Sequence, residues 1–240
     1  MDYSISVIVP CYNEEKSLDS TVQTIISAMS QKKIKDFEIL VFNDASEDNT
    51  GNLAKNLSIQ NKFVKSFDNK VRSGMGYSFR KGVELSNCDF CVMVPGDNEL
   101  PKESLAKLLG HTGKKDMVIS FFTNPLVRPL SRRIISKVFI YILNILFGCR
   151  LKYFNGHTII STRLLRSVPI ETTGHAYMAS ILIRLIYRGY SYTEIGILNG
   201  KREHGNSKSF TRDNLFAVIK TIFSLFCELR FDKKNTIQED

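Results

Sequence analysis

Four polar loops in the first half of the chain carry residue types that can hold a nucleotide. The ring of Tyr12 can lie against a base, and the carboxylate of Asp44 can accept hydrogen bonds from base or ribose donors. Asp97 and Glu99 offer the hard oxygen atoms that divalent cations prefer, so a cation there would sit on a diphosphate. Helix capping is the simpler explanation for the polar residues of any one loop, but it does not explain why all four loops are so polar. The loops are Pro10–Glu15, Asn43–Thr50, Arg72–Gly76 and Pro95–Glu99.

The segments around these loops predict a doubly wound α/β sheet. Apolar, β-branched runs alternate with helical patterns, which is typical of buried parallel strands joined by helices. Ligands of such sheets bind at the carboxyl ends of the strands, where these loops fall. The predicted strands are Ile5–Val9, Phe37–Phe42, Phe63–Phe67, Phe90–Val94 and Met117–Phe122, and the predicted helices between them are Leu18–Met29, Thr50–Leu57, Met75–Leu85 and Ser104–Leu109.

The pattern changes after about residue 123, where a basic segment leads into a long apolar helix. Glycine-containing loops then separate the remaining elements. We predict helices at Ser131–Phe147 and Ala176–Tyr187, a strand at Tyr192–Ile197 and an amphipathic helix at Asp213–Arg230.

Composition excludes some classes of protein. With 240 residues, 43% of them apolar, the chain can bury a sizeable core, so it is not disordered. The net charge of +9 attracts anions but does not indicate which class of anion the protein binds. Lys and Arg are spread along the chain without a nucleic-acid-binding motif, so we expect no nucleic acid partner. Five cysteines and no secretory signal indicate a cytoplasmic protein, and no apolar stretch is long enough to cross a bilayer.

Six stretches together resemble a known family. SVIVPCYNEE, EILVFNDASEDNTG, RSGMGYSFRKG and VMVPGDNELP, in this order, resemble the nucleotide-binding half of family-2 GT-A glycosyltransferases. RRIISK (132–137) and REHGNSK (202–208) are similar to stretches of the dolichyl-phosphate mannosyltransferase and polyprenyl-phosphate glycosyltransferase branch. The resemblance covers roughly residues 4–210. It implies a GT-A fold, with a Rossmann-like, mostly parallel sheet flanked by helices and a C-terminal amphipathic helix.

The resemblance also implies a domain organisation. Residues 1–230 would form one glycosyltransferase domain, with a nucleotide-sugar-binding half at 1–122 and an acceptor-binding half at 123–230. Residues 231–240 would be a flexible tail.

The nucleotide-binding roles implied by the resemblance fall in the first three loops. Pro10, Tyr12 and Glu14 would line the base and ribose, and Asp44 would hold the base. Arg72 could help to neutralise the leaving diphosphate. The complete predicted set is Pro10, Tyr12, Asn13, Glu14, Asp44, Ser46, Arg72 and Gly74.

The predicted metal site departs from the family pattern. Asp97 would help to hold Mg²⁺ or Mn²⁺ on the diphosphate, but Pro95 stands where the family usually has an acidic residue. Because proline cannot ligate a metal, the cation would depend on Asp97, Glu99 and the phosphates of the substrate. Loss of that carboxylate also raises the alternative of a catalytically degenerate domain that only binds nucleotide sugars.

The acceptor roles implied by the resemblance fall in the second half. Arginine can bind phosphate oxygens in a bidentate manner and lysine adds a point charge, so these residues suit an acceptor phosphate. The alternative is that Arg132 and Arg133 only begin a basic helix face. The predicted residues are Arg132, Arg202 and Lys208 as catalytic groups with Asp97, and Ser136, Asn155, Gly156 and Ser207 as acceptor-binding groups.

The choice of acceptor depends on whether a general base is needed. The resemblance implies inversion, and a hydroxyl acceptor would then require a base within hydrogen-bond reach. The acidic pair of many hydroxyl-transferring relatives is absent from Thr172–Ala179, leaving only Glu171 and His175 as titratable candidates nearby. A phosphate acceptor is already an anion, so we expect a polyprenyl phosphate.

Other readings stay open. One is transfer to a sugar hydroxyl, with His175 as base. A nucleotidyltransferase is disfavoured because PCYNEE lacks the usual glycine-rich, basic loop. The apolar helices Val138–Phe147 and Leu215–Phe226 allow either packing on the sheet or peripheral attachment to the cytoplasmic face of a membrane.

Overall fold

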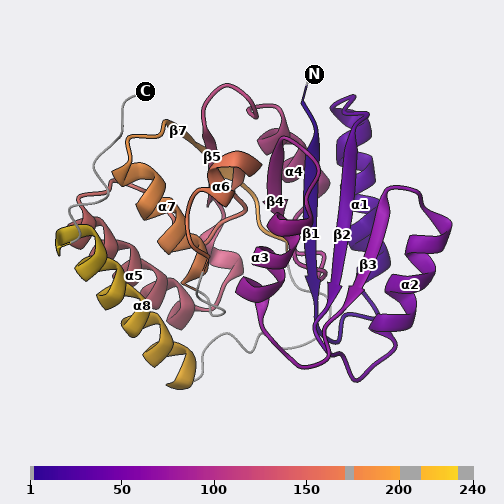
Figure 1. Cartoon of the computed structure of the whole chain (residues 1–240), viewed down its shortest axis with the longest axis horizontal. Helices are drawn as coiled ribbons and strands as arrows, with labels where there is room; N and C mark the ends of the chain where they lie inside the picture. The colour runs from indigo at the N-terminus through magenta and orange to yellow at the C-terminus, as the bar shows by residue number, and fades with distance from the viewer. Residues whose placement is uncertain (1–2, 171–175, 201–211, 232–240) are drawn as a thin grey trace.

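A seven-stranded sheet with helices on both faces forms the centre of the protein (Figure 1). The computed structural model describes residues 3–170, 176–200 and 212–231, with side chains of the last segment described from 218 to 230. The strands are β1 (Ile5–Cys11), β2 (Phe37–Asn43), β3 (Val64–Asp68), β4 (Phe90–Met93), β5 (Met117–Phe122), β6 (Ile159–Ser161) and β7 (Tyr192–Ile197). The helices are α1 (Leu18–Gln31), α2 (Thr50–Gln60), α3 (Met75–Leu85), α4 (Lys102–Leu109), α5 (Leu130–Phe147), α6 (Thr162–Arg166), α7 (Tyr177–Tyr187) and α8 (Arg212–Phe231), with a 3₁₀ turn η1 (Pro125–Val127).

The strand order β3-β2-β1-β4-β6-β5-β7 confirms the predicted mostly parallel sheet. Every predicted strand and helix is present, with ends that differ by at most a few residues. The prediction missed β6, a three-residue strand that runs antiparallel to both β4 and β5. It also missed the short helix α6. A three-residue strand shows no detectable hydrophobic period, so the sequence pattern cannot identify it.

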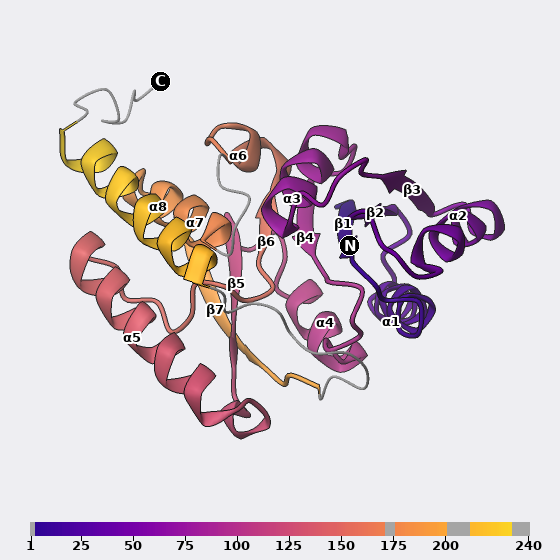
Figure 2. The same ribbon diagram turned by 90° about the horizontal axis from the view of Figure 1, so that it is seen from below.

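Two apolar cores lie on opposite faces of the sheet. Figure 2 shows helices on each of these faces. Alternate residues of β1 serve the two cores: Val7 and Val9 face α1, α2 and α4, whereas Ile8 faces α3 and the second-half helices. This two-sided burial explains why β1 and β2, which are buried throughout, are mostly apolar runs. Within the described residues, no helix is long and apolar enough to cross a membrane.

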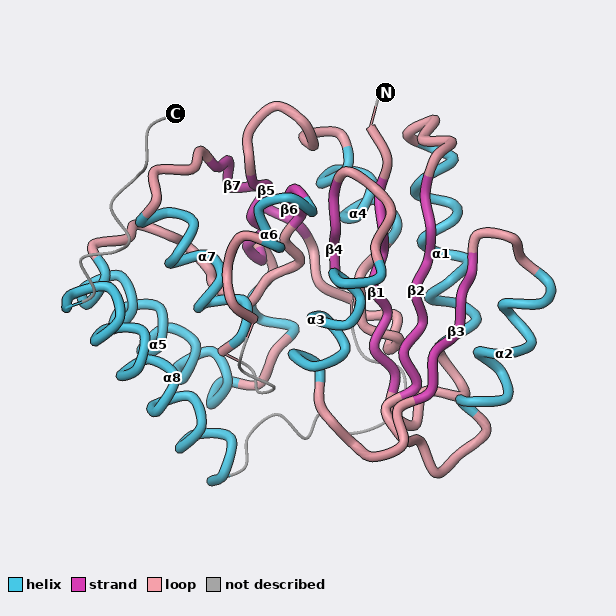
Figure 3. Tube along the Cα trace, viewed as in Figure 1, coloured by secondary structure: helices cyan, strands magenta, loops and turns pink. Residues whose placement is uncertain are grey.

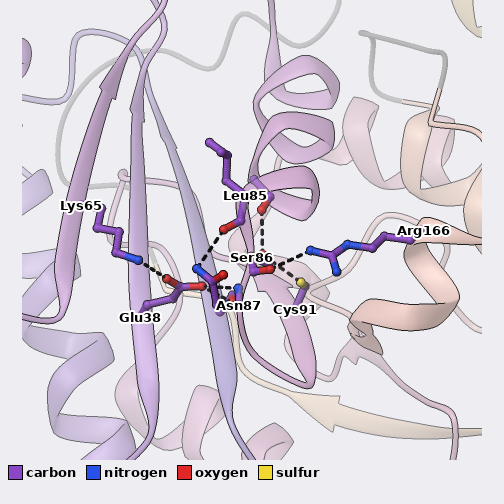
Figure 4. A network of polar contacts seen from close by, with 9 residues as sticks. Glu38, Lys65, Leu85, Ser86, Asn87, Cys91 and Arg166 are labelled. Carbon is purple, nitrogen blue, oxygen red and sulfur yellow. Dashed lines mark hydrogen bonds and ion pairs between the residues drawn. The ribbon is translucent and has the colours of Figure 1, made fainter.

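A polar network fixes the amino ends of the first strands (Figure 4). Glu38 Oε1 accepts hydrogen bonds from Ser6 Oγ and the Asn87 backbone N–H, both at 2.7 Å. Glu38 Oε2 pairs with Lys65 Nζ at 2.7 Å. Burial acts to raise the pKa of Glu38, but the hydrogen bonds from Lys65, Asn87 and Ser6 outweigh it and hold this pKa below its usual value. The carboxylate thereby joins three neighbouring strands and the loop before β4.

Candidate functional site

The predicted loops meet at the carboxyl edge of the sheet, opposite the Glu38 network (Figure 3). They follow β1, β2, β3 and β4, which are adjacent and parallel. The parallel register brings the ends of these strands to one edge, as the sequence predicts.

The first two loops are joined by hydrogen bonds between backbone and side chains. Asn13 N donates to Ser46 Oγ at 3.0 Å, and Glu47 N donates to Asn13 Oδ1 at 2.9 Å. Glu14 N donates to Thr50 Oγ1 at 2.8 Å. Asn13 has a left-handed backbone with φ 56°, a conformation that asparagine tolerates better than most residues. Asn13 and Ser46, both predicted to bind nucleotide, thus also hold the two loops together.

The carboxylate of Asp44 organises the third loop. It is only 5% exposed, and it accepts three hydrogen bonds of 2.8 Å, from the backbone N–H groups of Ser73 and Gly74 and from Asn69 Nδ2. Gly74 has φ 85°, which a residue with a side chain rarely adopts. Asp44 therefore lies among the predicted nucleotide ligands and also determines the position of Arg72 and Gly74. Sequence analysis did not identify Asn69, because an isolated asparagine after a strand looks like an ordinary turn residue.

Arg72 lies against the ring of Tyr12. Its guanidinium carbon is 4.0 Å from the ring centroid, within the range of a cation–π contact. The Tyr12 hydroxyl donates to Glu47 Oε1 at 3.4 Å. Two planar groups that suit stacking on a base are therefore adjacent.

The fourth loop places Asp97 beside the first. Gly96 N donates to the carbonyl of Pro10 at 3.1 Å, and Ser17 Oγ lies 2.8 Å from the Gly96 carbonyl. The Asp97 side chain accepts from Glu99 N at 3.3 Å. Glu99 Oε2 lies 3.5 Å from Asn199 Nδ2, so this carboxylate extends toward the segment after β7.

The chemistry of this loop fits a divalent cation only in part. Asp97 and Glu99 supply oxygen donors, whereas Pro95 supplies none. In the described part of the chain, no three His, Cys, Asp or Glu side chains are grouped so that they could hold a metal. A cation at Asp97 would therefore need phosphate oxygens from the substrate to complete its ligands.

His157 also lies at this edge, although sequence analysis did not select it. Its Nδ1 is 3.1 Å from the Met93 carbonyl at the end of β4, and its ring meets Phe122 edge to face. Burial lowers the pKa of His157, opposed by the Met93 hydrogen bond and the charge of Asp97. The residue reaches the site because β6 is antiparallel, so the residues just before β6 lie beside the carboxyl ends of β4 and β5.

The predicted acceptor residues Asn155 and Gly156 precede His157. A Cβ built on Gly156 would lie 2.5 Å from the Ser120 carbonyl oxygen, so this glycine allows the loop to approach β5 closely. Asn155 is exposed. Gly156 therefore has a packing role, whatever its contact with an acceptor.

The basic segment after β5 includes an arginine that sequence analysis did not select. Arg128 Nη1 donates to Tyr153 Oη at 2.8 Å, and its guanidinium lies 5.8 Å from the Phe122 ring centroid. Arg132 and Ser136 follow one turn apart on α5, both half-buried. The other predicted acceptor and base residues, Glu171, His175, Arg202, Ser207 and Lys208, lie outside the described residues.

Comparison with known proteins decides the family. The model of glycosyl transferase family 2 matches residues 6–174, which include all four loops and His157. The chain belongs to this family. It is a glycosyltransferase that uses a nucleotide sugar, which confirms the predicted fold and enzyme class.

Relatives of this glycosyltransferase include enzymes named for lipid-phosphate acceptors. An undecaprenyl-phosphate mannosyltransferase from Micrococcus luteus is 28% identical over 216 residues, covering 85% of this chain and 86% of that protein. A dolichyl-phosphate β-glucosyltransferase from Dictyostelium discoideum is 32% identical over 102 residues, covering 39% of this chain and 30% of that protein.

Solved structures confirm the GT-A-like fold of the glycosyltransferase. Glucosyl-3-phosphoglycerate synthase from Mycobacterium tuberculosis, solved with Mn²⁺, UDP-glucose and phosphoglyceric acid, superposes with a TM-score of 0.67. The match covers 95% of this chain and 80% of that chain at 21% identity. Another structure of the same synthase contains Mg²⁺ and UDP.

Proposed function

We propose that this glycosyltransferase moves a sugar, with inversion, from a nucleoside-diphosphate sugar to the phosphate of a polyprenyl phosphate. The observation that carries the proposal is the surface of α5. This helix contains Arg132 and Ser136, the described residues predicted to meet the acceptor phosphate, and a long exposed apolar face. The similarity to an undecaprenyl-phosphate mannosyltransferase over most of both chains supports the same acceptor class.

The exposed apolar residues of α5 are spaced so that they lie along one side of the helix. Leu130, Ile134, Val138, Tyr141 and Ile145 are between 52% and 68% exposed, and Leu143 is the one buried residue of the helix. A continuous apolar surface of this kind is unusual where a protein faces water, and it is typical of an interaction site.

Basic residues accompany this stripe. Arg132, Arg133 and Lys137 lie on the first two turns of α5. An apolar stripe with adjacent basic residues suits an interface that contains anionic lipid. We infer peripheral attachment through α5, which would keep the tail of a lipid acceptor in the membrane while its phosphate meets Arg132.

The donor side of the reaction uses the carboxyl edge of the sheet. Tyr12 and Arg72 would stack on or beside the base, and Asp44 would hold the loop that carries Arg72 by accepting hydrogen bonds from its backbone N–H groups. A divalent cation, when bound, neutralises charge on the leaving diphosphate. Asp97 would hold that cation, with Glu99 as a further oxygen donor.

The chemical step would need no general base. An oxygen of the acceptor phosphate forms a bond to the anomeric carbon while the bond from that carbon to the donor diphosphate breaks. Arg132, Arg202 and Lys208 would orient the phosphate acceptor. In this assignment, 1–122 forms the donor half and 123–230 the acceptor half of one domain, followed by a tail at 231–240.

The test is a transfer assay with the full-length protein. Radiolabelled UDP- and GDP-sugars are offered separately with undecaprenyl phosphate in detergent, with Mg²⁺ or Mn²⁺, and the lipid product is identified by mass spectrometry. We expect one donor class to label the lipid phosphate, and Arg132→Gln to reduce labelling by about 10-fold or more, since a bidentate phosphate contact is lost. Arg163→Gln, on α6, is the matched control.

Other results would redirect the assignment. Labelling of a free sugar acceptor but not of the lipid would favour hydroxyl transfer. Tight binding of UDP or GDP without any turnover would identify a degenerate nucleotide-sugar-binding domain.

A further inference from the structure

We propose that His157 Nε2 is a ligand of the divalent cation at Asp97 and substitutes for the carboxylate that Pro95 cannot supply. This inference rests on the proposed donor site. It concerns a residue outside the four loops, brought to them by the antiparallel strand β6.

The position of His157 follows from the strand register. Ile159 and Ile160 pair with Val118 and Met117 of β5, and Ile160 also pairs with Cys91 of β4. Because β6 runs antiparallel to both neighbours, the residues just before β6 continue toward the carboxyl end of β4 and along β5. His157 thereby reaches the carbonyl of Met93, a residue that precedes Asp97 by four positions in the chain. The charge of Asp97 acts on its ring.

The hydrogen bond to Met93 determines which nitrogen is available. A backbone carbonyl only accepts hydrogen bonds, so the Nδ1 atom 3.1 Å away must carry the proton. In a neutral imidazole, Nε2 then has a free lone pair. Metal-binding histidines are commonly oriented in this way, with one ring nitrogen donating to a carbonyl and the other ligating the metal.

The ring is also held in place from the side. Phe122 lies edge to face with His157, with 6.4 Å between ring centroids. Phe122 in turn meets Tyr153 at 5.3 Å, and Tyr153 accepts from Arg128. These contacts fix the imidazole from both strands that flank β6, so little ordering is required when a cation binds.

An imidazole ligand has a consequence for metal choice. Mg²⁺ is a hard cation that binds oxygen ligands in a strict octahedral geometry, whereas Mn²⁺ is a transition-metal ion and accepts an imidazole nitrogen more readily than Mg²⁺ does. A site composed of Asp97, His157 and the donor diphosphate should therefore favour Mn²⁺.

The test measures ligation directly. Mn²⁺ is added to the full-length protein with UDP or with GDP, and pulsed electron paramagnetic resonance detects ¹⁴N coupling to the bound ion. The variant His157→Asn keeps an N–H group near the position of Nδ1 but removes Nε2. His111→Asn, in the turn after α4, is the matched control.

We expect ¹⁴N modulation in the wild type and in His111→Asn, and its loss in His157→Asn. The Mn²⁺ affinity of His157→Asn should fall by about 10-fold or more, since removing metal-site groups has effects of this size. Binding of Mn²⁺ without ¹⁴N modulation, modulation that persists in His157→Asn, or no Mn²⁺ binding at all would each overturn the inference.

These outcomes are separate from those of the proposed function. If the protein labels polyprenyl phosphate but Mn²⁺ shows no ¹⁴N coupling, the function stands and His157 only holds β6 against β4. If His157-dependent coupling is found without lipid labelling, the metal site stands and the acceptor assignment fails.

Discussion

The two edges of the sheet use buried carboxylates in different ways. At the amino edge, Glu38 accepts from Ser6, Lys65 and Asn87, which belong to strands or lie directly beside them. At the carboxyl edge, Asp44 accepts from Asn69, Ser73 and Gly74, which lie in the loop between β3 and α3.

The difference lies in what each carboxylate holds. Glu38 joins elements that the apolar core already orders, so its contribution is to stability. Asp44 orders the loop that carries Arg72, so we expect its contribution to be to ligand binding. The same hydrogen-bond chemistry therefore supports the fold at one edge and the site at the other.

The largest effect should come from Asp97, at the carboxyl edge. Asp97→Asn should lower the transfer rate about 100- to 1000-fold, since a charge that supports the leaving group is removed. The free energy of unfolding should change by less than about 0.5 kcal/mol. Initial rates and urea unfolding measure both quantities. Glu103→Gln, whose side chain is 74% exposed on α4, is the control and should leave the rate unchanged. A rate loss that only matches a loss of folded protein would contradict this prediction.

Asp44 should show the next largest effect. Asp44→Asn replaces an acceptor oxygen by an NH₂ group that faces N–H donors, so the loop around Arg72 should loosen. We expect the affinity for UDP or GDP to fall about 10- to 100-fold, since charged hydrogen bonds contribute about 1.5–3 kcal/mol each. Calorimetry measures this affinity.

Trypsin offers a readout of Asp44→Asn that does not depend on the ligand. Cleavage after Lys70 and Arg72 should accelerate in the variant. The exposed Asp36→Asn is the matched control. Unchanged cleavage together with weakened binding would show that Asp44 contacts the base without ordering the loop.

Glu38 should affect stability alone. Glu38→Gln should lower the free energy of unfolding by about 2 kcal/mol, since it weakens hydrogen bonds from a lysine and a backbone N–H to a buried group. The transfer rate per folded molecule should stay within about twofold. Urea unfolding and active-site titration separate the two quantities. A large loss of rate in fully folded protein would mean that the two edges are coupled.

The smallest predicted effect is the change with pH of the free energy that Glu38 contributes to the stability of the fold. Because the folded pKa of Glu38 lies below its usual value, its stabilising contribution is present above the unfolded pKa of about 4.3 and declines as pH falls through the folded pKa. The stability difference between wild type and Glu38→Gln should therefore shrink from pH 6 toward about pH 3. A difference that grows on acidification would show that this pKa is raised in the folded state.

Much of the fold and of the donor site follows from local patterns. The runs that became β1, β2 and most of β4 and β5 are buried on two faces, so their apolar continuity is visible in the sequence, whereas β3 is an edge strand in which only Val64 is buried. Once these strands are parallel, the polar residues that follow them must meet at one edge. Tyr12, Asp44, Arg72 and Asp97 were therefore predictable as neighbours.

His157 and Arg128 were not predictable in this way. His157 depends on β6, whose three residues carry no periodicity, and on an antiparallel direction that no local pattern specifies. Arg128 is held by Tyr153, 25 residues later in the chain. Neither residue carries a local signal that distinguishes it from an ordinary surface residue.

The sequence by itself determined the α/β class, the family, and which polar loops follow which strands. These features depend on short-range periodicity and on the order of motifs along the chain. Only the tertiary structure decided that Asp44 orders the Arg72 loop, that β6 brings His157 to the Asp97 loop, and that α5 leaves its apolar stripe exposed. The physical reason is that strand direction, packing partners and burial depend on contacts between residues far apart in the chain.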